Sequence, residues 1–173
     1  MRPTISVPNN TNNDSENNIV KETERAKPIV FEPFEKWNSY RIKSTDIEIK
    51  YPYELFISTD NNKIIFDYLD PEDPEQKKEY SPLAEMRISL EKGSMDELIA
   101  KRKSQDPINL KQKEIALNNI AAQQLVYTSG LDGGTMYETY IPQNNTTVVI
   151  WYAGDSQLGI IFAEMLSTAK YSK

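Results

Sequence analysis

Residues 146–153 read Thr-Thr-Val-Val-Ile-Trp-Tyr-Ala, and this stretch decides the fold. Its centre, from Val148 to Tyr152, is apolar without alternation, so both faces of the strand that it predicts must be covered. A strand that is buried on both faces belongs in the middle of a sheet. The stretch therefore predicts a sheet with a further layer packed on each side.

Shorter strand patterns surround this stretch and are separated by turn residues. In the last third of the chain the separators are Asn118-Asn119, a glycine-rich segment at 130–134 and Pro-Gln-Asn-Asn at 142–145. Connections this short join antiparallel neighbours into consecutive hairpins. The predicted strands are, in order, 45–51, 55–58, 63–69, 84–90, 111–117, 121–129, 135–141 and 146–153.

Two helices are predicted as well. Ser94 and Glu97 have the spacing of a capping box, and Pro107 lies beyond the helix that they begin, which covers about 95–104. Near the carboxyl end, one apolar helix face follows the i, i+3, i+4, i+7, i+8 spacing, with Leu158, Ile161, Phe162, Met165 and Leu166. We therefore expect an α+β domain with an antiparallel β-sheet flanked by helices on both faces, as an α-β-α sandwich.

The first 36 residues differ from the rest of the chain. Residues 3–18 are mostly polar and have no apolar periodicity, so we expect them to be disordered. Pro28 and Pro33 interrupt residues 19–36, which we interpret as a linker with a few apolar residues that could dock on the domain. The predicted organisation is a polar tail and linker at 1–36 and one folded domain at 37–173.

Composition excludes several functions. The 173 residues include 20 Lys+Arg and 26 Asp+Glu, and the net charge of -6 argues against a nucleic-acid partner. The absence of Cys and His excludes a thiol nucleophile, an imidazole base and the usual zinc ligands. No apolar run has the length of a signal peptide or membrane span. Either the protein is cytoplasmic with a flexible arm, or a signal or anchor precedes Met1 in the native protein.

Several segments of the domain resemble the PsbP-like family. They are Trp37-Asn38-Ser39-Tyr40, Ile47-Glu48-Ile49-Lys50-Tyr51-Pro52, Asn-Ile-Ala-Ala-Gln-Gln at 119–124 and Phe-Ala-Glu-Met-Leu-Ser-Thr-Ala-Lys-Tyr at 162–171. Their order and spacing carry the resemblance over residues 37–171. The family is named for an extrinsic subunit of the oxygen-evolving complex of photosystem II, and similar domains occur in bacterial lipoproteins and secreted proteins. The resemblance implies a sheet between helices, an anchored extracytoplasmic location and no catalytic residues.

An acidic loop is the candidate metal site. It follows Asp67 and carries the carboxylates Asp70, Glu72, Asp73 and Glu75. A hard cation such as Ca²⁺ takes several oxygen ligands from one loop. The loop lacks the residue order of an EF-hand and contains two prolines, so a solvated loop is the simpler interpretation and weak calcium binding is the alternative.

Glu138 is the candidate catalytic acid. It lies between Tyr137 and Tyr140 in a strand that we expect to be substantially buried. A buried carboxylate is costly unless it is paired, so Glu138 is either a tuned acid or base or the partner of an Arg or Lys on a neighbouring strand. We expect the pairing, and hence no catalytic residue.

These observations predict a non-enzymatic, extracytoplasmic binding or assembly module of PsbP-like type. It would be tethered by its polar arm, act through contacts with an unidentified protein partner and need no cofactor. One alternative is a cytoplasmic adaptor with the same fold, as in the Ran-binding nuclear import factor that shares it. The other is a hydrolase that uses Glu138 and a loop carboxylate.

Overall fold

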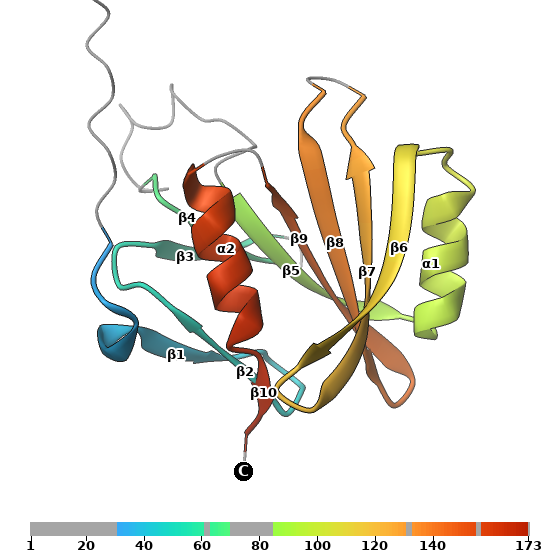
Figure 1. The fold of residues 1–173 in the computed structure, drawn as a ribbon. Helices are drawn as coiled ribbons and strands as arrows, with labels where there is room; N and C mark the ends of the chain where they lie inside the picture. Colours follow the sequence, from blue (N-terminus) through green and yellow to red (C-terminus); the bar gives the residue numbers. More distant parts are fainter. Residues whose placement is uncertain (1–30, 61–62, 70–84, 131–132, 155–156, 173) are drawn as a thin grey trace, which may run out of the picture.

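The fold is built mainly from strands, which form two antiparallel sheets (Figure 1). A computed structural model describes residues 31–60, 63–69, 85–130, 133–154 and 157–172. Of these described residues, 54% lie in strands and 18% in helices. None of the helices described is both long and apolar enough to cross a membrane.

The smaller sheet has three strands. It places β2 (Ile47–Tyr51) between β1 (Asn38–Arg41) and β10 (Lys170–Tyr171), and both neighbours are antiparallel to β2. A short 3-10 helix, η1 (Phe34–Lys36), precedes β1. The alternation at 45–51 predicted β2 correctly, whereas β10 is only two residues long and has no periodicity that could reveal it.

The larger sheet has seven strands in the order β3-β4-β5-β9-β8-β7-β6. Every neighbouring pair in it is antiparallel. The strands are β3 (Phe56–Asp60), β4 (Lys63–Asp67), β5 (Glu85–Lys92), β6 (Ile108–Leu117), β7 (Ile120–Thr128), β8 (Thr135–Gln143) and β9 (Thr146–Ala153). These strands confirm the hairpins expected from the turn residues, although the tips at 61–62 and 131–132 lie outside the described residues.

The central strand of the larger sheet is β9, as the unbroken apolar stretch predicted. Val148, Ile150 and Tyr152 are buried on the face that meets the smaller sheet, which we call the inner face. Val149 lies on the opposite, outer face and is also buried. Both faces of β9 are therefore covered at its middle.

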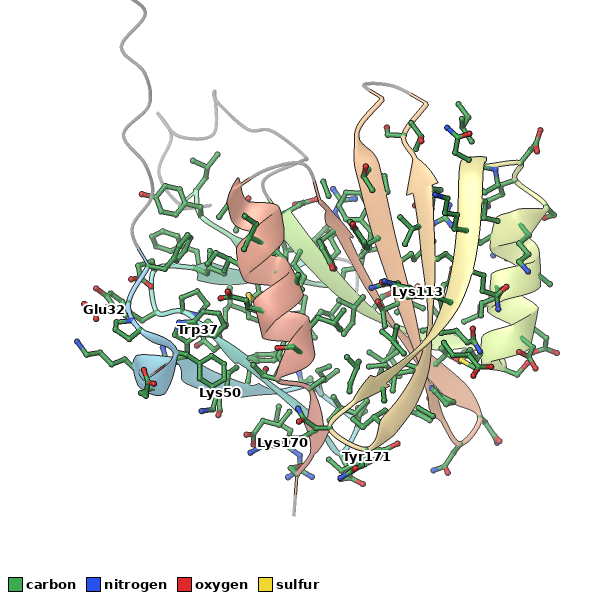
Figure 2. All side chains as sticks on the ribbon, in the orientation of Figure 1. Glu32, Trp37, Lys50, Lys113, Lys170 and Tyr171 are labelled. Carbon is green, nitrogen blue, oxygen red and sulfur yellow. The ribbon has the colours of Figure 1, made fainter. Side chains whose placement is uncertain are left out.

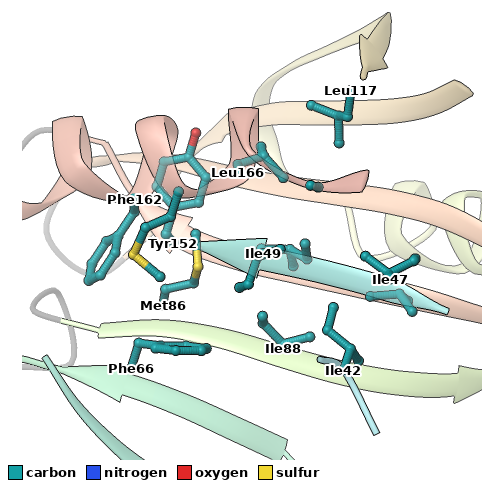
Figure 3. Close-up of a cluster of buried hydrophobic side chains, with 14 of the residues drawn as sticks. Ile42, Ile47, Ile49, Phe66, Met86, Ile88, Leu117, Tyr152, Phe162 and Leu166 are labelled. Carbon is teal, nitrogen blue, oxygen red and sulfur yellow. The ribbon is translucent and has the colours of Figure 1, made fainter. Parts of the chain in front are cut away.

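The main core lies between the inner face, the smaller sheet and helix α2 (Gln157–Ser167) (Figure 3). Its fully buried side chains come from all three of these parts and include Ile47, Ile49, Phe66, Met86, Ile88, Ile150, Phe162 and Met165. The apolar helix face predicted at the carboxyl end supplies the contribution of α2. Burial of a large apolar side chain is worth about 1.5–3 kcal/mol, so α2 is a main contributor to stability.

The expected α-β-α sandwich is wrong. The fold is β-rich, with two α-helices among the described residues. The layer on the inner face combines α2 with the smaller sheet, because Ile47 and Ile49 of β2 pack into the main core together with the apolar side chains of α2. The alternation in 45–51 showed that this strand is half-buried, but it did not show that the strand belongs to a separate sheet.

Helix α1 (Met95–Lys103) lies on the outer face of the larger sheet. The predicted capping box is present: Glu97 N donates to Ser94 Oγ at 3.3 Å, and Ser94 N donates to Glu97 Oε2 at 2.8 Å. Ile99 packs with Leu125, Tyr140 and Val149 in a second, smaller core. The helix begins where the capping residues predicted it.

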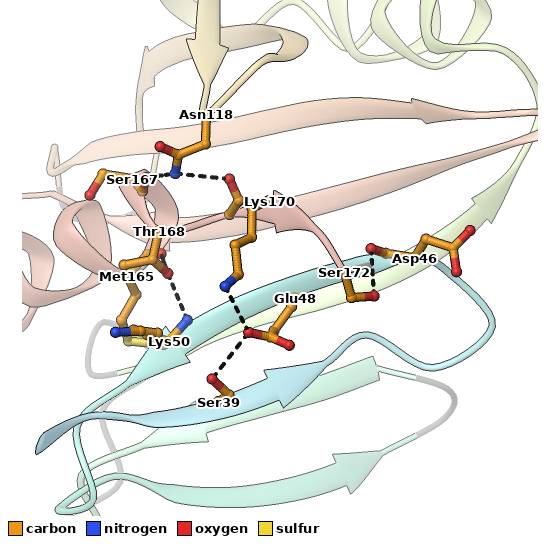
Figure 4. Close-up of polar contacts among 11 residues, drawn as sticks. Ser39, Asp46, Glu48, Lys50, Asn118, Met165, Ser167, Thr168, Lys170 and Ser172 are labelled. Carbon is orange, nitrogen blue, oxygen red and sulfur yellow. Dashed lines mark hydrogen bonds and ion pairs between the residues drawn. The ribbon is translucent and has the colours of Figure 1, made fainter. Parts of the chain in front are cut away.

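Polar contacts hold the end of α2 to both sheets (Figure 4). Thr168 Oγ1 accepts from Lys50 N of β2 at 2.6 Å and donates to Met165 O at 2.7 Å. From the turn after β6, Asn118 Nδ2 donates to Ser167 O at 2.8 Å and to Ala169 O at 3.2 Å. Among these acceptors, Ser167 O belongs to the last turn of α2, where carbonyls have no partner within the helix.

The last residues of the predicted linker are docked on the domain. Phe31 packs against the main core, and Glu32 N donates to Glu54 Oε1 at 2.8 Å. Trp37 Nε1 donates to Glu32 O at 3.0 Å. The predicted disordered tail, and Ile29 and Val30 of the linker, fall outside the described residues.

Candidate functional site

The outer face of the larger sheet contains a cavity of about 280 Å³ beside α1. Two cross-strand rows of the sheet form its floor, with Lys63, Ser89, Val149 and Tyr140 in one row and Arg87, Trp151 and Glu138 in the next. The wall on the side of α1 consists of Leu98, Lys101, Arg102 and Gln105. Glu91 completes the lining, and we call this hollow the Trp151 cavity.

Side-chain size explains why the sheet is hollowed here. Ser89 and Val149 face each other across β5 and β9, and both have small side chains. The larger side chains of Arg87, Trp151 and Tyr140 surround them on the same face. The register of the strands therefore places a low floor inside a rim of long and aromatic side chains.

Glu138 is held by Arg102 from α1. Arg102 Nε donates to Glu138 Oε2 and Arg102 Nη2 donates to Glu138 Oε1, both at 2.6 Å. The side chain of Glu138 is 6% exposed and that of Arg102 is 32% exposed. A two-bond pair of this kind is the arrangement that compensates a buried carboxylate. Hydrogen bonding to Glu138 raises the pKa of Arg102 above its ordinary value, so the guanidinium stays charged.

The predicted pairing of Glu138 is confirmed, but its partner was placed wrongly. We expected an Arg or Lys on a neighbouring strand, whereas Arg102 belongs to the helix that crosses the outer face. Arg102 Nη1 also donates to Gln105 Oε1 at 2.7 Å. The sequence shows which residues are on α1, but not which strand the helix packs against.

Two tyrosines beside this pair keep their protons well above neutral pH. Burial raises the pKa of Tyr140, and the negative charge of Glu138 raises it further. Burial also raises the pKa of Tyr127, whose ring centroid is 5.6 Å from Arg102 Cζ. Both phenols therefore stay protonated near neutral pH and do not act as bases.

Arg87 covers one side of Trp151. Its Cζ lies 5.0 Å from the centroid of the indole ring, within the range of a cation–π contact. Arg87 also forms an ion pair with Glu85, whose side chain is 1% exposed. Sequence reasoning missed this buried pair. The signal that could have found it is the i, i+2 spacing of opposite charges, which puts both residues on one face of β5.

The cavity lining contains more cations than carboxylates. Its cations are Lys63, Arg87, Lys101 and Arg102, and its carboxylates are Glu91 and Glu138. Arg87 and Arg102 are paired with buried carboxylates. Lys63 and Lys101 form no ion pair with another residue in the part of the chain that the structure describes. The cavity is therefore lined by two ammonium groups that have no ion-pair partner among the described residues.

The acidic loop is not tested by the structure. Asp70, Glu72, Asp73 and Glu75 lie outside the described residues. Within the described ranges, no group of three or more His, Cys, Asp or Glu could hold a metal ion. Asp67 at the end of β4 is buried, and its Oδ1 accepts from Leu69 N at 2.9 Å. Calcium binding by the loop stays a prediction.

A second hollow, of about 570 Å³, lies at the end of the smaller sheet. Lys50, Lys170 and Tyr171 are found in this region (Figure 2). Lys50 Nζ lies 4.7 Å from the ring centroid of Phe34, and Lys170 forms an ion pair with Glu48 at 3.4 Å. Its cations are therefore already engaged, which makes it a weaker candidate than the Trp151 cavity.

Sequence comparisons find no family model that matches the chain and no curated protein that matches it. Among solved structures, a protein of Bacteroides thetaiotaomicron VPI-5482 has 15% identity and a TM-score of 0.47. The match covers 74% of this chain and 46% of that protein, so the chain spans less than half of its length. The protein PA94 of Pseudomonas aeruginosa, of unknown function, has 14% identity and a TM-score of 0.37, with 74% and 88% covered. The resemblance to the PsbP-like family stays a prediction.

Proposed function

We propose that this chain is a non-enzymatic binding module whose ligand is held in the Trp151 cavity. The observation that carries the proposal is the two-bond pairing of Glu138 with Arg102. A carboxylate held in this way is neither a free nucleophile nor a free general base. The remaining lining offers an indole, apolar side chains and a few polar groups, a composition typical of small-ligand sites.

The hydrolase alternative needs a second carboxylate at a set distance. Glycoside hydrolysis, for example, uses two carboxyl groups about 5–9.5 Å apart, one of which must carry a proton. In the Trp151 cavity the second carboxylate is Glu91, on an exposed part of β5 and two positions beyond Ser89. Both carboxylate oxygens of Glu138 accept hydrogen bonds from Arg102, which argues against a role as the acid that donates a proton to a leaving group.

The proposed location is extracytoplasmic, with the polar N-terminal segment as a tether. The composition of residues 3–18 supports this, because a polar segment without apolar periodicity stays hydrated and can bridge the distance between an anchor and the folded domain. A cytoplasmic adaptor with the same domain is the alternative. Fractionation of cells that express the native gene with a C-terminal tag distinguishes the two, because an anchored protein sediments with the membranes.

The binding function is tested by filling the cavity. Ser89→Phe places a ring on the low part of the floor, and Ser39→Phe on the exposed strand β1 is the matched control. A library of small charged and neutral compounds is screened against both variants by thermal shift. We expect the ligands of the unaltered chain to be lost in Ser89→Phe and kept in Ser39→Phe.

Two results would contradict the proposal. One is that ligands bind Ser89→Phe as tightly as the unaltered chain, which would place their site elsewhere. The other is that the unaltered chain hydrolyses a member of a panel of ester, glycoside and phosphate substrates and that Glu138→Gln abolishes this turnover. Thermal melts of each variant show whether it is folded.

A further inference from the structure

The charge of the Trp151 cavity is opposite to that of the protein. The chain has a net charge of -6, whereas four of the lining side chains are cationic and two are anionic. If charges were placed at random on an acidic protein, a cavity would be expected to contain more carboxylates than cations. A local excess of positive charge in a concave site attracts anions and concentrates them there.

The two lysines supply the positive charge that is available to a ligand, and Glu91 is the lining carboxylate that no arginine pairs with among the described residues. Arg87 and Arg102 are each neutralised by a buried carboxylate, Glu85 and Glu138 respectively. Lys63 reaches the cavity from the hairpin end of β4, next to Ser89 in the strand register, and Lys101 reaches it from α1. Cations from two separate elements thus line the same hollow.

A role in the stability of the fold, without any ligand, explains only one of these two lysines. Basic residues in the last turn of a helix interact favourably with its dipole, and α1 has Lys101, Arg102 and Lys103 there. This explains why a lysine stands at 101. It does not explain Lys63, which is on a strand, and Lys103 on the same turn does not line the cavity. Lys103 is therefore the natural control for helix-dipole effects.

The apolar part of the lining limits the kind of anion. Leu98, Val149 and the indole of Trp151 provide apolar surface beside the lysines. A volume of about 280 Å³ lies at the small end of ligand sites. An inorganic anion would use the charges and leave the apolar surface wet, whereas an organic anion with a flat apolar group would use both.

We infer that the Trp151 cavity binds a small organic anion, with a carboxylate or phosphate held by Lys63 and Lys101 and an apolar group against Trp151 and Val149. This inference rests on the proposed binding function and names the class of its ligand. Hydrogen bonds to charged groups are worth about 1.5–3 kcal/mol, so each lysine should contribute about tenfold or more to affinity.

Benzoate and phenyl phosphate are suitable probes, with benzamide as the neutral match for benzoate. Binding is followed by calorimetry on the unaltered chain and by the fluorescence of Trp151 in a Trp37→Phe variant, where it is the one remaining tryptophan. We expect both anions to bind at least tenfold more tightly than benzamide. We also expect Lys63→Met and Lys101→Met each to weaken phenyl phosphate binding about tenfold, and Lys103→Met to leave it unchanged.

The outcomes separate the inference from the proposed function. If benzamide binds as tightly as benzoate and Ser89→Phe abolishes both, the cavity is a binding site but the anion inference is wrong. If the anions bind equally well to Lys63→Met, Lys101→Met and Ser89→Phe, they bind elsewhere and the inference is wrong. If no compound of any charge binds, the proposed function fails together with the inference. Binding that is weakened in Lys101→Met but kept in Lys101→Arg would support the role of charge.

Discussion

Exposure differs between the two partners of the Glu138–Arg102 pair. The Glu138 side chain is 6% exposed, whereas that of Arg102 is 32% exposed. The guanidinium of Arg102 would therefore be partly hydrated if Glu138 were removed. Loss of Arg102 would leave a buried carboxylate uncompensated, which is the costlier of the two losses. Glu138 therefore depends on Arg102 for its stability in the fold more than Arg102 depends on Glu138.

We predict that Arg102→Met lowers the free energy of unfolding by about 3 kcal/mol and that Glu138→Gln lowers it by less. The double variant should cost less than the sum of the two single changes, because it removes the buried charge and its partner together. Urea denaturation of the four proteins measures these values. Equal costs for the two single variants would contradict the argument from burial.

Buried tyrosines predict a loss of stability at alkaline pH. Burial raises the pKa of Tyr152 to about 12 from an ordinary value of 10.0, and burial also raises the pKa of Tyr127 and Tyr140. Between these pH values the folded chain holds protons that the unfolded chain has lost. The contribution is therefore complete below pH 10.0 and is lost as the pH rises toward about 12.

The measurement is a series of urea unfolding curves across this alkaline range. We expect the contribution of Tyr152 alone to lower the free energy of unfolding by about 1–3 kcal/mol across this range. The free energy of unfolding of Tyr152→Phe should therefore fall less steeply with pH than that of the unaltered chain. Tyr53 is 58% exposed, so Tyr53→Phe is the control and should leave the slope unchanged. Parallel curves for all three proteins would show that Tyr152 is not responsible.

At the scale of elements, β6 is an exposed edge strand of the larger sheet. An unpaired edge can pair with another chain, and natural proteins protect it with lysines and bulges. β6 has both, with a register shift between Ile108 and Lys111 and exposed lysines at 111 and 113. Two-fold pairing centred on Gln112 would place Lys111 opposite Lys113 of a second copy, and pairing centred on Lys113 would place this lysine opposite itself.

We therefore predict that Lys111→Thr/Lys113→Thr promotes self-association. Threonine favours strands and removes the like-charge repulsion that opposes both central registers. Sedimentation velocity measures the outcome, and a double variant of the exposed Lys43 and Lys103 to threonine controls for the change in net charge. A monomeric edge variant at high concentration would mean that the bulge at 108–111 is sufficient protection.

Single elements could be predicted because their signals are local. The capping box at Ser94 and Glu97, the apolar face of α2 and the apolar run in β9 depend on residues that are close in sequence. The predicted pairing of Glu138 follows from the cost of a buried charge. In each of these cases a short segment and one physical rule are enough.

The arrangement of the elements could not be predicted in the same way. β10 joins residues 170–171 to a strand more than a hundred residues earlier, and no local pattern marks it. The separation into two sheets and the meeting of Lys63 with Lys101 at one cavity likewise depend on long-range packing. The α-β-α expectation was wrong for this reason, since apolar faces were identified correctly but assigned to the wrong layers.

At the scale of the whole molecule, the two sheets share one core. Side chains from the smaller sheet, the larger sheet and α2 form a single buried cluster. Thr168 bonds to β2 and Asn118 bonds to the end of α2, so the polar contacts also cross between the sheets. Neither sheet can expose its inner face without also uncovering the other, and we expect the domain to unfold as one unit.

The two tryptophans test this expectation because they report on different parts. Trp37 is buried beside the smaller sheet, and Trp151 lies on the outer face of the larger sheet. We predict that urea unfolding followed by fluorescence in Trp37→Phe and in Trp151→Phe has the same midpoint as the far-ultraviolet circular dichroism of each variant. A Trp37 signal lost at lower urea than the dichroism would show that the smaller sheet separates first, because its fluorescence depends on contacts that only the joined sheets provide.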